Sequence, residues 1–197
     1  MDESANIVYK DYFSYMGPVE EDDQVLNFFP WTSLVDYYDP DTNGWCGYCC
    51  VGWATGIFEQ DLADSSGTII REMLKETLQE FRKQFLAFFG RDDYMQVVDT
   101  LTRTPDNTTD WWFSAPACLW VAVVTFRTSF FFADIAYQQA YLHRCPGTVI
   151  SNSTVPCLLL LHRQHIHAYQ VRNYTHSAGD DDLEQVNFDL IFGSILS

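Results

Sequence analysis

Hydrophobic residues recur at helical spacing most clearly between residues 65 and 90. The apolar positions at steps of three and four are Ile70, Leu74, Leu78, Phe81, Phe85 and Phe88. Charged residues fill most of the positions between them, which is typical of an amphipathic helix with one buried face. We expect Ser65 or Ser66 to cap the start of this helix and Gly90 to end it.

Other apolar stretches predict shorter elements. Residues 45–58 and 94–101 fit helices, whereas residues 120–126 fit helix or strand because an unbroken apolar run has no period. Residues 130–132 predict a short buried strand. Residues 155–161 and 165–171 predict two strands of a hairpin, and residues 187–192 a possible edge strand. Helices first and strands later indicate an α+β domain with helices packed on a small, mainly antiparallel sheet.

Charge divides the chain of 197 residues into three parts. Residues 1–41 carry ten acidic residues and one lysine, hence a formal charge of −9, and form an acidic N-terminal extension that also contains aromatic residues. Residues 42–176 hold the main domain. Residues 177–197 form an acidic C-terminal segment that includes the possible edge strand.

Composition restricts the partners. The net charge of −16 argues against a nucleic-acid partner, because binding to phosphates needs lysine and arginine. No apolar run approaches the roughly 20 residues needed to cross a bilayer, so we expect no membrane contact. Two of the six cysteines are adjacent and no signal peptide opens the chain, which favours reduced thiols and a cytoplasmic location.

Cys46 is the strongest candidate nucleophile. It follows the turn formers Asn43 and Gly44 and opens the helix predicted for residues 45–58. The positive end of a helix can stabilise a thiolate, and loop amides before it can stabilise an oxyanion. The alternative is a structural thiol, because many buried cysteines are inert.

Histidines downstream can supply a base. On a strand, His165 and His167 point to the same face, and His162 lies in the turn before them. A third group must orient the imidazole. Candidates for this role are His167, Asp39, Asp41 and Asn173, and the sequence leaves the choice open.

Metal binding is a competing interpretation. Cys46, Cys49, His162 and His165 have the ligand types of a zinc site, and Cys46 with Cys49 also matches a redox Cys-x-x-Cys pair. The long gap between the two ligand pairs and the large aromatic content disfavour zinc, and no β-α-β pattern surrounds the redox motif. We therefore expect no metal and no cofactor.

Four segments, in order, resemble OTU-like cysteine proteases, closest in motif style to viral and transposon-borne members. Residues 43–48 (Asn-Gly-Trp-Cys-Gly-Tyr) resemble the family signature Asp-Gly-x-Cys-Gly-aromatic. Residues 71–74 look like the helix after the cysteine, and residues 112–116 are similar to a Trp-Met-x-x-Pro segment. Residues 165–171 fall where the family histidine opens a late strand.

This resemblance implies a papain-like OTU fold and a thiol protease that cleaves after the C-terminal glycine of ubiquitin or a ubiquitin-like modifier. It implies Cys46 as nucleophile and His165 as base. It also implies an oxyanion hole formed by the loop at Asn43 and Gly44 together with the amide of Cys46. We further expect substrate contacts at Trp45, Trp112 and Ile166.

Three departures from the family pattern affect the site. Asn43 replaces the usual Asp, Ile166 replaces an aromatic residue, and His167 stands where Asp or Asn is common. The third catalytic residue is therefore open among Asp39, Asp41, Asn43 and His167. A shifted register would make His167 the base.

Three functions fit these residues. The first is a deubiquitinase acting in the cytoplasm, or in the host cytoplasm if the protein is viral. The second is a viral papain-like protease that processes its own polyprotein. The third is an inactive OTU-like or zinc-stabilised interaction module.

Overall fold

The computed structural model describes residues 34–58, 64–134, 139–146, 157–162, 164–171 and 183–196. Within these ranges the chain forms six helices and five strands. In chain order they are β1 (Leu34–Tyr38), α3 (Cys46–Ala54), α4 (Asp64–Glu80), α5 (Arg82–Phe89), α6 (Arg91–Thr102), α7 (Ala117–Phe126), β2 (Phe130–Asp134), β3 (Gln139–His143), β4 (Cys157–His162), β5 (His165–Val171) and α8 (Leu183–Leu196).

The five strands form one sheet in the order β1-β5-β4-β2-β3. Three neighbouring pairs are antiparallel, and β2 with β4 is parallel. The structure is therefore compatible with the predicted α+β class, and its mixed sheet is mainly antiparallel, as expected. None of the described helices is both long and apolar enough to cross a membrane.

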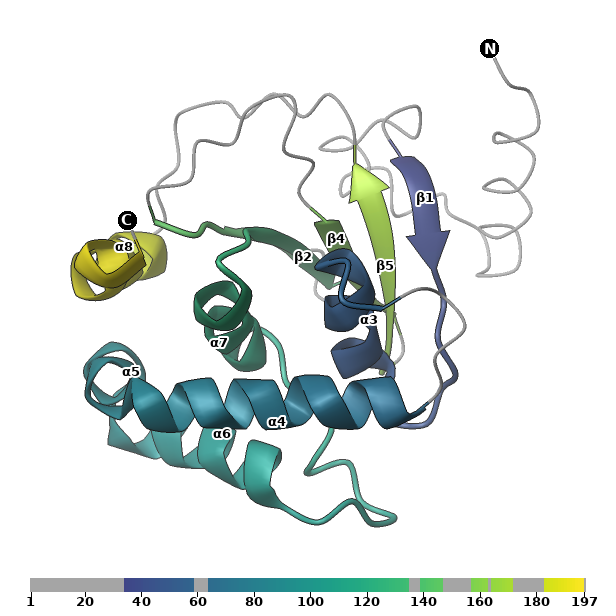
Figure 1. Ribbon diagram of the computed structural model, residues 1–197, viewed down its shortest axis with the longest axis horizontal. Coiled ribbons are helices and arrows are strands. Elements are labelled where there is room, and N and C mark those ends of the chain that lie inside the picture. Colours follow the sequence, from purple (N-terminus) through teal and green to yellow (C-terminus); the bar gives the residue numbers. More distant parts are fainter. Residues whose placement is uncertain are drawn as a thin grey trace.

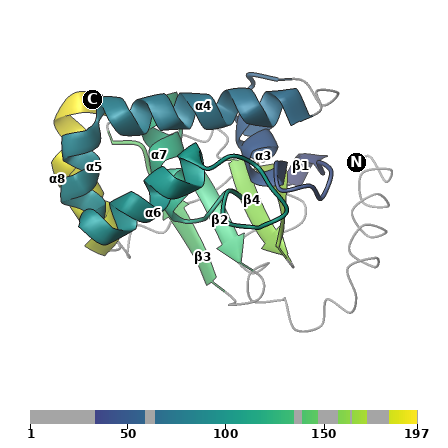
Figure 2. The same ribbon diagram turned by 90° about the horizontal axis from the view of Figure 1, so that it is seen from below.

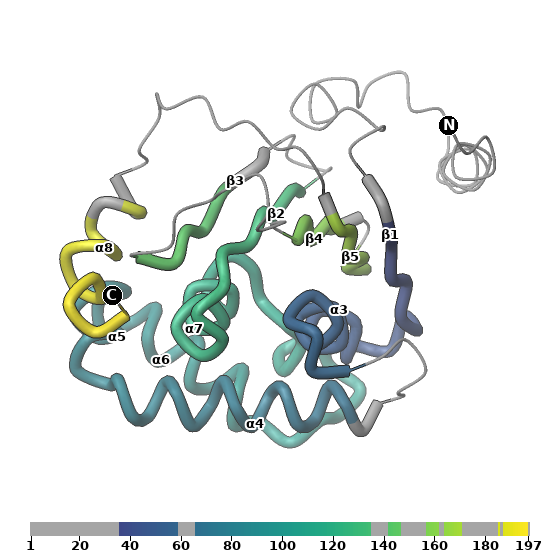
Figure 3. The backbone as a smooth tube through the Cα atoms, turned by 45° about the horizontal axis from the view of Figure 1, so that its top comes forward, coloured from purple at the N-terminus to yellow at the C-terminus, as the bar shows by residue number. Residues whose placement is uncertain are grey.

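The helices are layered on one face of the sheet (Figures 1 and 2). α3 and α7 lie between the sheet and the long helix α4 (Figure 3). α5 and α8 lie at the end of α4 away from α3, and α6 runs back alongside α4 (Figure 1). α7 is enclosed in this arrangement, and residues 118–124 within it are all buried. This enclosure explains why residues 120–126 show no helical period and why the helical alternative is correct.

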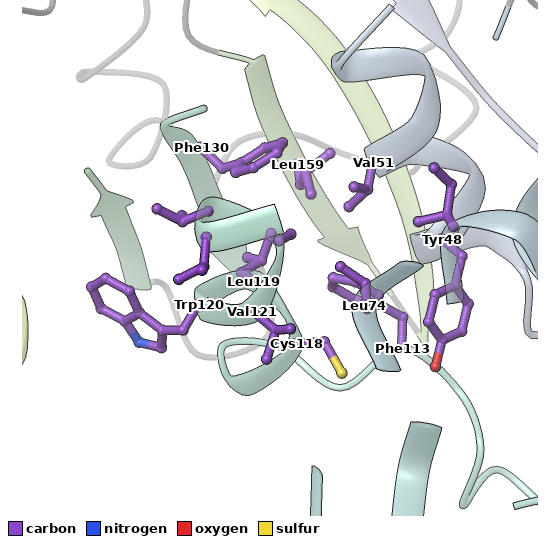
Figure 4. Close-up of a cluster of buried hydrophobic side chains, with 14 of the residues drawn as sticks. Tyr48, Val51, Leu74, Phe113, Cys118, Leu119, Trp120, Val121, Phe130 and Leu159 are labelled. Carbon is purple, nitrogen blue, oxygen red and sulfur yellow. The ribbon is translucent and has the colours of Figure 1, made fainter. Parts of the chain in front are cut away.

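A continuous apolar core joins these layers (Figure 4). Side chains with no exposed surface come from both inner helices, from α4 and from two strands: Tyr48, Val51, Leu74, Leu119, Phe130 and Leu159. Full burial of a large apolar side chain stabilises a fold by roughly 1.5–3 kcal/mol. The core therefore holds α3 firmly against the sheet.

Most sequence-based elements are confirmed, with changed boundaries. The helices at residues 45–58 and 94–101, the strand at 130–132 and the hairpin are present as α3, α6, β2 and β4–β5. The long helix differs from the prediction. It begins at Asp64, so Ser66 lies inside it, and it breaks at Phe81 into α4 and α5 before ending at Gly90, whose φ is 78°.

Two predictions about the chain ends need correction. The edge strand predicted for residues 187–192 is wrong, because this segment belongs to α8. Phe188 and Phe192, four residues apart, share one helix face and pack against Phe88 of α5. At the other end, β1 lies within the acidic extension assigned to residues 1–41, yet it pairs with β5 and is part of the sheet.

Candidate active site

A tight turn leads into the helix that carries Cys46. The backbone N–H of Trp45 donates to Asn43 Oδ1 at 3.2 Å, and the N–H of Asn43 donates to the Asp41 carbonyl at 2.9 Å. Gly44 has a φ of 84°, a conformation that favours glycine. The sequence Asn-Gly thus folds as predicted, as a turn directly before the nucleophile candidate.

Close packing fixes this turn and the first residues of α3. A Cβ on Gly44 would lie 2.7 Å from Trp112 Cδ1 and 2.8 Å from Trp111 Cη2. A Cβ on Gly47 would lie 2.6 Å from Phe113 Cγ and 2.9 Å from Ile166 Cδ1 of β5. Both glycines therefore allow approaches that larger residues would block, and the second brings α3 close to β5.

Cys46 is the first residue of α3, and its side chain is buried, with 4% of its surface exposed. The N–H groups in the first turn of a helix have no partner inside the helix, and they carry its positive end. This position can stabilise a thiolate, and it provides a backbone donor beside the sulfur. The proposed oxyanion hole of Asn43, Gly44 and Cys46 lies along this same short segment.

The pairing of β1 with β5 brings Asp39 to the histidines. Tyr38 lies opposite Ala168 in the antiparallel register, so the next residue, Asp39, comes opposite His167. Asp39 Oδ1 lies 2.8 Å from His165 Nε2 and 2.9 Å from His167 Nδ1. The two imidazole rings stand nearly perpendicular, with centroids 4.3 Å apart. One carboxylate oxygen thus binds both histidines.

These contacts change the protonation of Asp39 and His165. Hydrogen bonds from His165 and then from His167 hold the pKa of the Asp39 carboxyl well below its usual range, although burial opposes this. Burial of His165 favours its neutral form. The hydrogen bond to Asp39, together with charge interactions with Cys46 and Asp39, outweighs that effect and raises the pKa of His165 to about 9.

The contact with Asp39 also determines which ring nitrogen of His165 can serve Cys46. Nε2 is bound to Asp39, whereas Nδ1 is buried without a hydrogen-bond partner. Nδ1 is therefore the nitrogen left for Cys46, which lies near enough to raise the pKa of the ring. Catalytic hydrogen bonds are often misaligned before substrate binds. The arrangement can move a proton from Cys46 to Nδ1 while Asp39 orients the imidazolium.

The structure brings together four of the candidate catalytic residues, Cys46, His165, His167 and Asp39. Asp41 is exposed in the loop before the turn, and Asn43 supplies its side chain to the turn itself. Asn173 lies outside the described residues. The roles assigned to these residues remain predictions.

The three candidate substrate contacts occupy different surroundings. Trp112 is partly exposed and lies over Gly44. Trp45 is partly exposed and packs between Gly67 of α4 and Trp111, with its ring centroid 4.8 Å from that of Trp111. Ile166 is 3% exposed and packs on Gly47, so its buried position does not fit the substrate contact that the sequence predicted.

Arg71 is a residue whose position the sequence did not reveal. It was assigned to the polar face of the long helix, but it is 6% exposed and donates to the Thr100 carbonyl at 2.7 Å and to the Arg103 carbonyl. Its guanidinium lies about 6 Å from the ring centres of Trp45 and Trp111. Cations are attracted to the faces of indole rings. The tryptophans near the cysteine and in residues 111–112 were therefore the sequence signal for a buried arginine at this place.

Cys46 and Cys49, weighed as zinc ligands in the sequence, do not belong to the group of possible metal ligands found among the described residues. Cys49 Sγ faces Gly67 of α4, where an added Cβ would lie 3.2 Å from the sulfur. Among the described residues, the group with three possible metal ligands is Asp39, His165 and His167, whose ligand atoms lie within 4.8 Å of one another. All six cysteines are free and buried.

Comparison with protein-family models gave no match, and no curated protein matches the chain. The chemical interpretation of the site therefore depends on its geometry. The relevant features are the position of Cys46 at a helix start, the free Nδ1 of His165 and the bond between His165 and Asp39.

Proposed function

We propose that this protein is a cysteine-dependent deubiquitinase with an OTU-like, papain-like fold. Cys46 is the nucleophile, His165 the general base and Asp39 the residue that orients the imidazole. The observation that carries the proposal is that Asp39 binds Nε2 of His165 and leaves the buried Nδ1 for a thiol at the start of α3.

The reaction follows from these positions. His165 Nδ1 accepts the thiol proton, and the Cys46 sulfur attacks the carbonyl carbon of the C-terminal glycine of the modifier. The N–H groups of Gly44 and Cys46 bind the oxyanion that forms. The imidazolium then donates its proton to the leaving lysine amine, and water hydrolyses the resulting thioester with His165 again acting as base.

Ubiquitin, or a ubiquitin-like modifier, is the proposed substrate because of the motif resemblance in residues 42–171. The net charge of −16 supports this choice, since an acidic surface is attracted to the basic recognition face of ubiquitin. The proposed location is the cytoplasm, or the host cytoplasm for a viral protein. The structure adds no observation that favours polyprotein self-processing over this substrate.

Ubiquitin carrying a C-terminal thiol-reactive group tests the proposal. We expect a covalent adduct of wild-type protein that peptide mapping places on Cys46. Cys46→Ala should abolish the adduct, whereas Cys49→Ala, the matched neighbour, should retain it. An adduct that survives Cys46→Ala would contradict the assignment of the nucleophile. Failure with ubiquitin and with a panel of ubiquitin-like modifiers would contradict the proposed substrate class.

A further inference from the structure

We propose that Asp39, His165 and His167 form a binding site for a divalent transition-metal ion, with Zn²⁺ as the best fit, and that the bound ion inhibits the thiol chemistry. The inhibition rests on the proposed function, whereas the metal site does not. This departs from the sequence-based expectation, which included no metal and considered zinc only with cysteine ligands.

The three ligand atoms already lie close to the arrangement that zinc requires. Asp39 Oδ1 is 2.8 Å from His165 Nε2 and 2.9 Å from His167 Nδ1. Zinc bonds to nitrogen and oxygen are about 2.0–2.2 Å, so ligand atoms around a tetrahedral ion stand roughly 3.3–3.5 Å apart. The Asp39 oxygen would move outward from each nitrogen by about half an ångström, and the two nitrogens, which lie within 4.8 Å of each other, would close to the same separation around the ion.

The backbone fixes these ligands independently of any ion. His165 and His167 are separated by one residue on β5, and Asp39 follows β1, the strand paired with it. The histidine side chains are 13% and 6% exposed, so protein atoms shield them from most of the solvent. Two imidazoles and one carboxylate held by adjoining strands are a ligand set that suits zinc and leaves one coordination position open.

His167 is the residue that distinguishes this site from a simple catalytic triad. A triad requires one imidazole on the carboxylate, yet here a second imidazole nitrogen contacts the same Oδ1. Two nitrogens converging on one oxygen are redundant for orienting His165. The same convergence supplies the third ligand of a metal site.

Occupation of this site would stop His165 from acting as the base. A metal ion on Nε2 takes the lone pair there, so the neutral imidazole must carry its proton on Nδ1. Nδ1 is the nitrogen left for Cys46, and in that form it cannot accept the thiol proton. The ion also occupies Asp39, which then no longer holds the catalytic tautomer.

Metal binding is tested in the full chain carrying Cys46→Ala, which removes the proposed activity and one possible thiol ligand. Zn²⁺ calorimetry and Co²⁺ absorption spectroscopy should show one ion per chain with a nitrogen and oxygen ligand spectrum. Adding Asp39→Asn or His167→Gln should each weaken binding at least about tenfold. Asp41→Asn, the neighbouring exposed carboxylate, should leave it unchanged, and thermal unfolding should show that each variant is folded.

Absent binding, or binding that neither Asp39→Asn nor His167→Gln weakens, would overturn the proposed site. Inhibition is tested separately with wild-type protein and a ubiquitin substrate. Zn²⁺ at the concentration that saturates the site should abolish hydrolysis, and a chelator should restore it. Hydrolysis that continues with the site saturated would overturn the inhibitory role. Metal binding by a protein that hydrolyses no substrate would leave the site supported and contradict only the proposed function.

Discussion

Asp39 contacts both histidines of the candidate site through a single carboxylate oxygen. It accepts hydrogen bonds from His165 Nε2 and His167 Nδ1, and these bonds keep the pKa of its own carboxyl low. The same contact helps raise the pKa of His165 to about 9, so the imidazole keeps the proton that it takes from Cys46 at neutral pH. An imidazolium beside Cys46 stabilises a thiolate and holds the proton that the leaving amine requires.

Asp39→Asn should change the pH dependence of the proposed hydrolysis. In wild-type protein, kcat/KM should fall as the pH rises through about 9, because His165 then loses the proton that it must donate. In Asp39→Asn this fall should occur at lower pH, since the carboxylate that raises the pKa of His165 is gone. We expect kcat/KM at pH 8 to decrease about 10²–10⁴-fold.

The profiles are measured with a chelator present, and Asp41→Asn is the control. An unchanged upper limb in Asp39→Asn would contradict the role of Asp39.

His165→Ala and His167→Ala should differ in their effects. His165 carries the nitrogen left for Cys46, so its loss should lower kcat/KM by about 10³-fold or more. His167 contacts Asp39 and the ring of His165 and is not the nitrogen left for Cys46, so we expect a loss of about tenfold. Steady-state kinetics of both variants test this difference. A larger loss at His167 would reverse the assignment of the base.

Two short elements position the proposed catalytic groups on the scaffold. β1 is five residues long, and its pairing with β5 places Asp39 opposite the histidine pair. α3 is nine residues long, and it is held against β5 by the close approach at Gly47. Between them, the turn at Gly44 determines where α3 begins. The geometry of the site therefore depends on the register of β1 and on the packing of this turn.

Gly44→Ala should be more damaging than Gly56→Ala, although both glycines have positive φ. Gly56, with a φ of 69°, has no atom within 4 Å of an added Cβ, so alanine there should cost about 1 kcal/mol of backbone strain. At Gly44 the same strain is joined by a clash with Trp111 and Trp112, for a total of roughly 2–4 kcal/mol. Urea unfolding measures both costs. Equal destabilisation by the two variants would contradict the tight packing around the turn.

At the scale of the whole molecule, local patterns predicted the elements better than their assembly. The period of Ile70, Leu74 and Leu78 predicted α4, and the apolar runs on either side of residue 163 predicted the β4–β5 hairpin. In α8, residues 187–190 alternate polar and apolar, which is the period of a strand, and this pattern hid the helix. The break at Phe81 and the pairing of β1 also could not be predicted, because they depend on contacts between distant segments.

The candidate site was predictable only where it depends on local sequence features. A turn, a cysteine at a helix start and two histidines on one strand face are local features, so Cys46, His165 and His167 could be proposed from spacing. The choice of Asp39 over Asp41 could not, since the register between β1 and β5 decides which of the two carboxylates, two residues apart, meets the histidines. Arg71 was missed because its burial comes from α6 and Trp111.

The protein contains six buried thiols, and we propose that its fold activates one of them, Cys46. The most direct test is the rate at which iodoacetamide alkylates each cysteine of the folded protein at pH 7, followed by peptide mapping. Cys46 should react first, and His165→Ala should slow its reaction about tenfold or more, because the imidazolium no longer stabilises the thiolate. A Cys46 that reacts no faster than the other five thiols, or at the same rate without His165, would contradict the account.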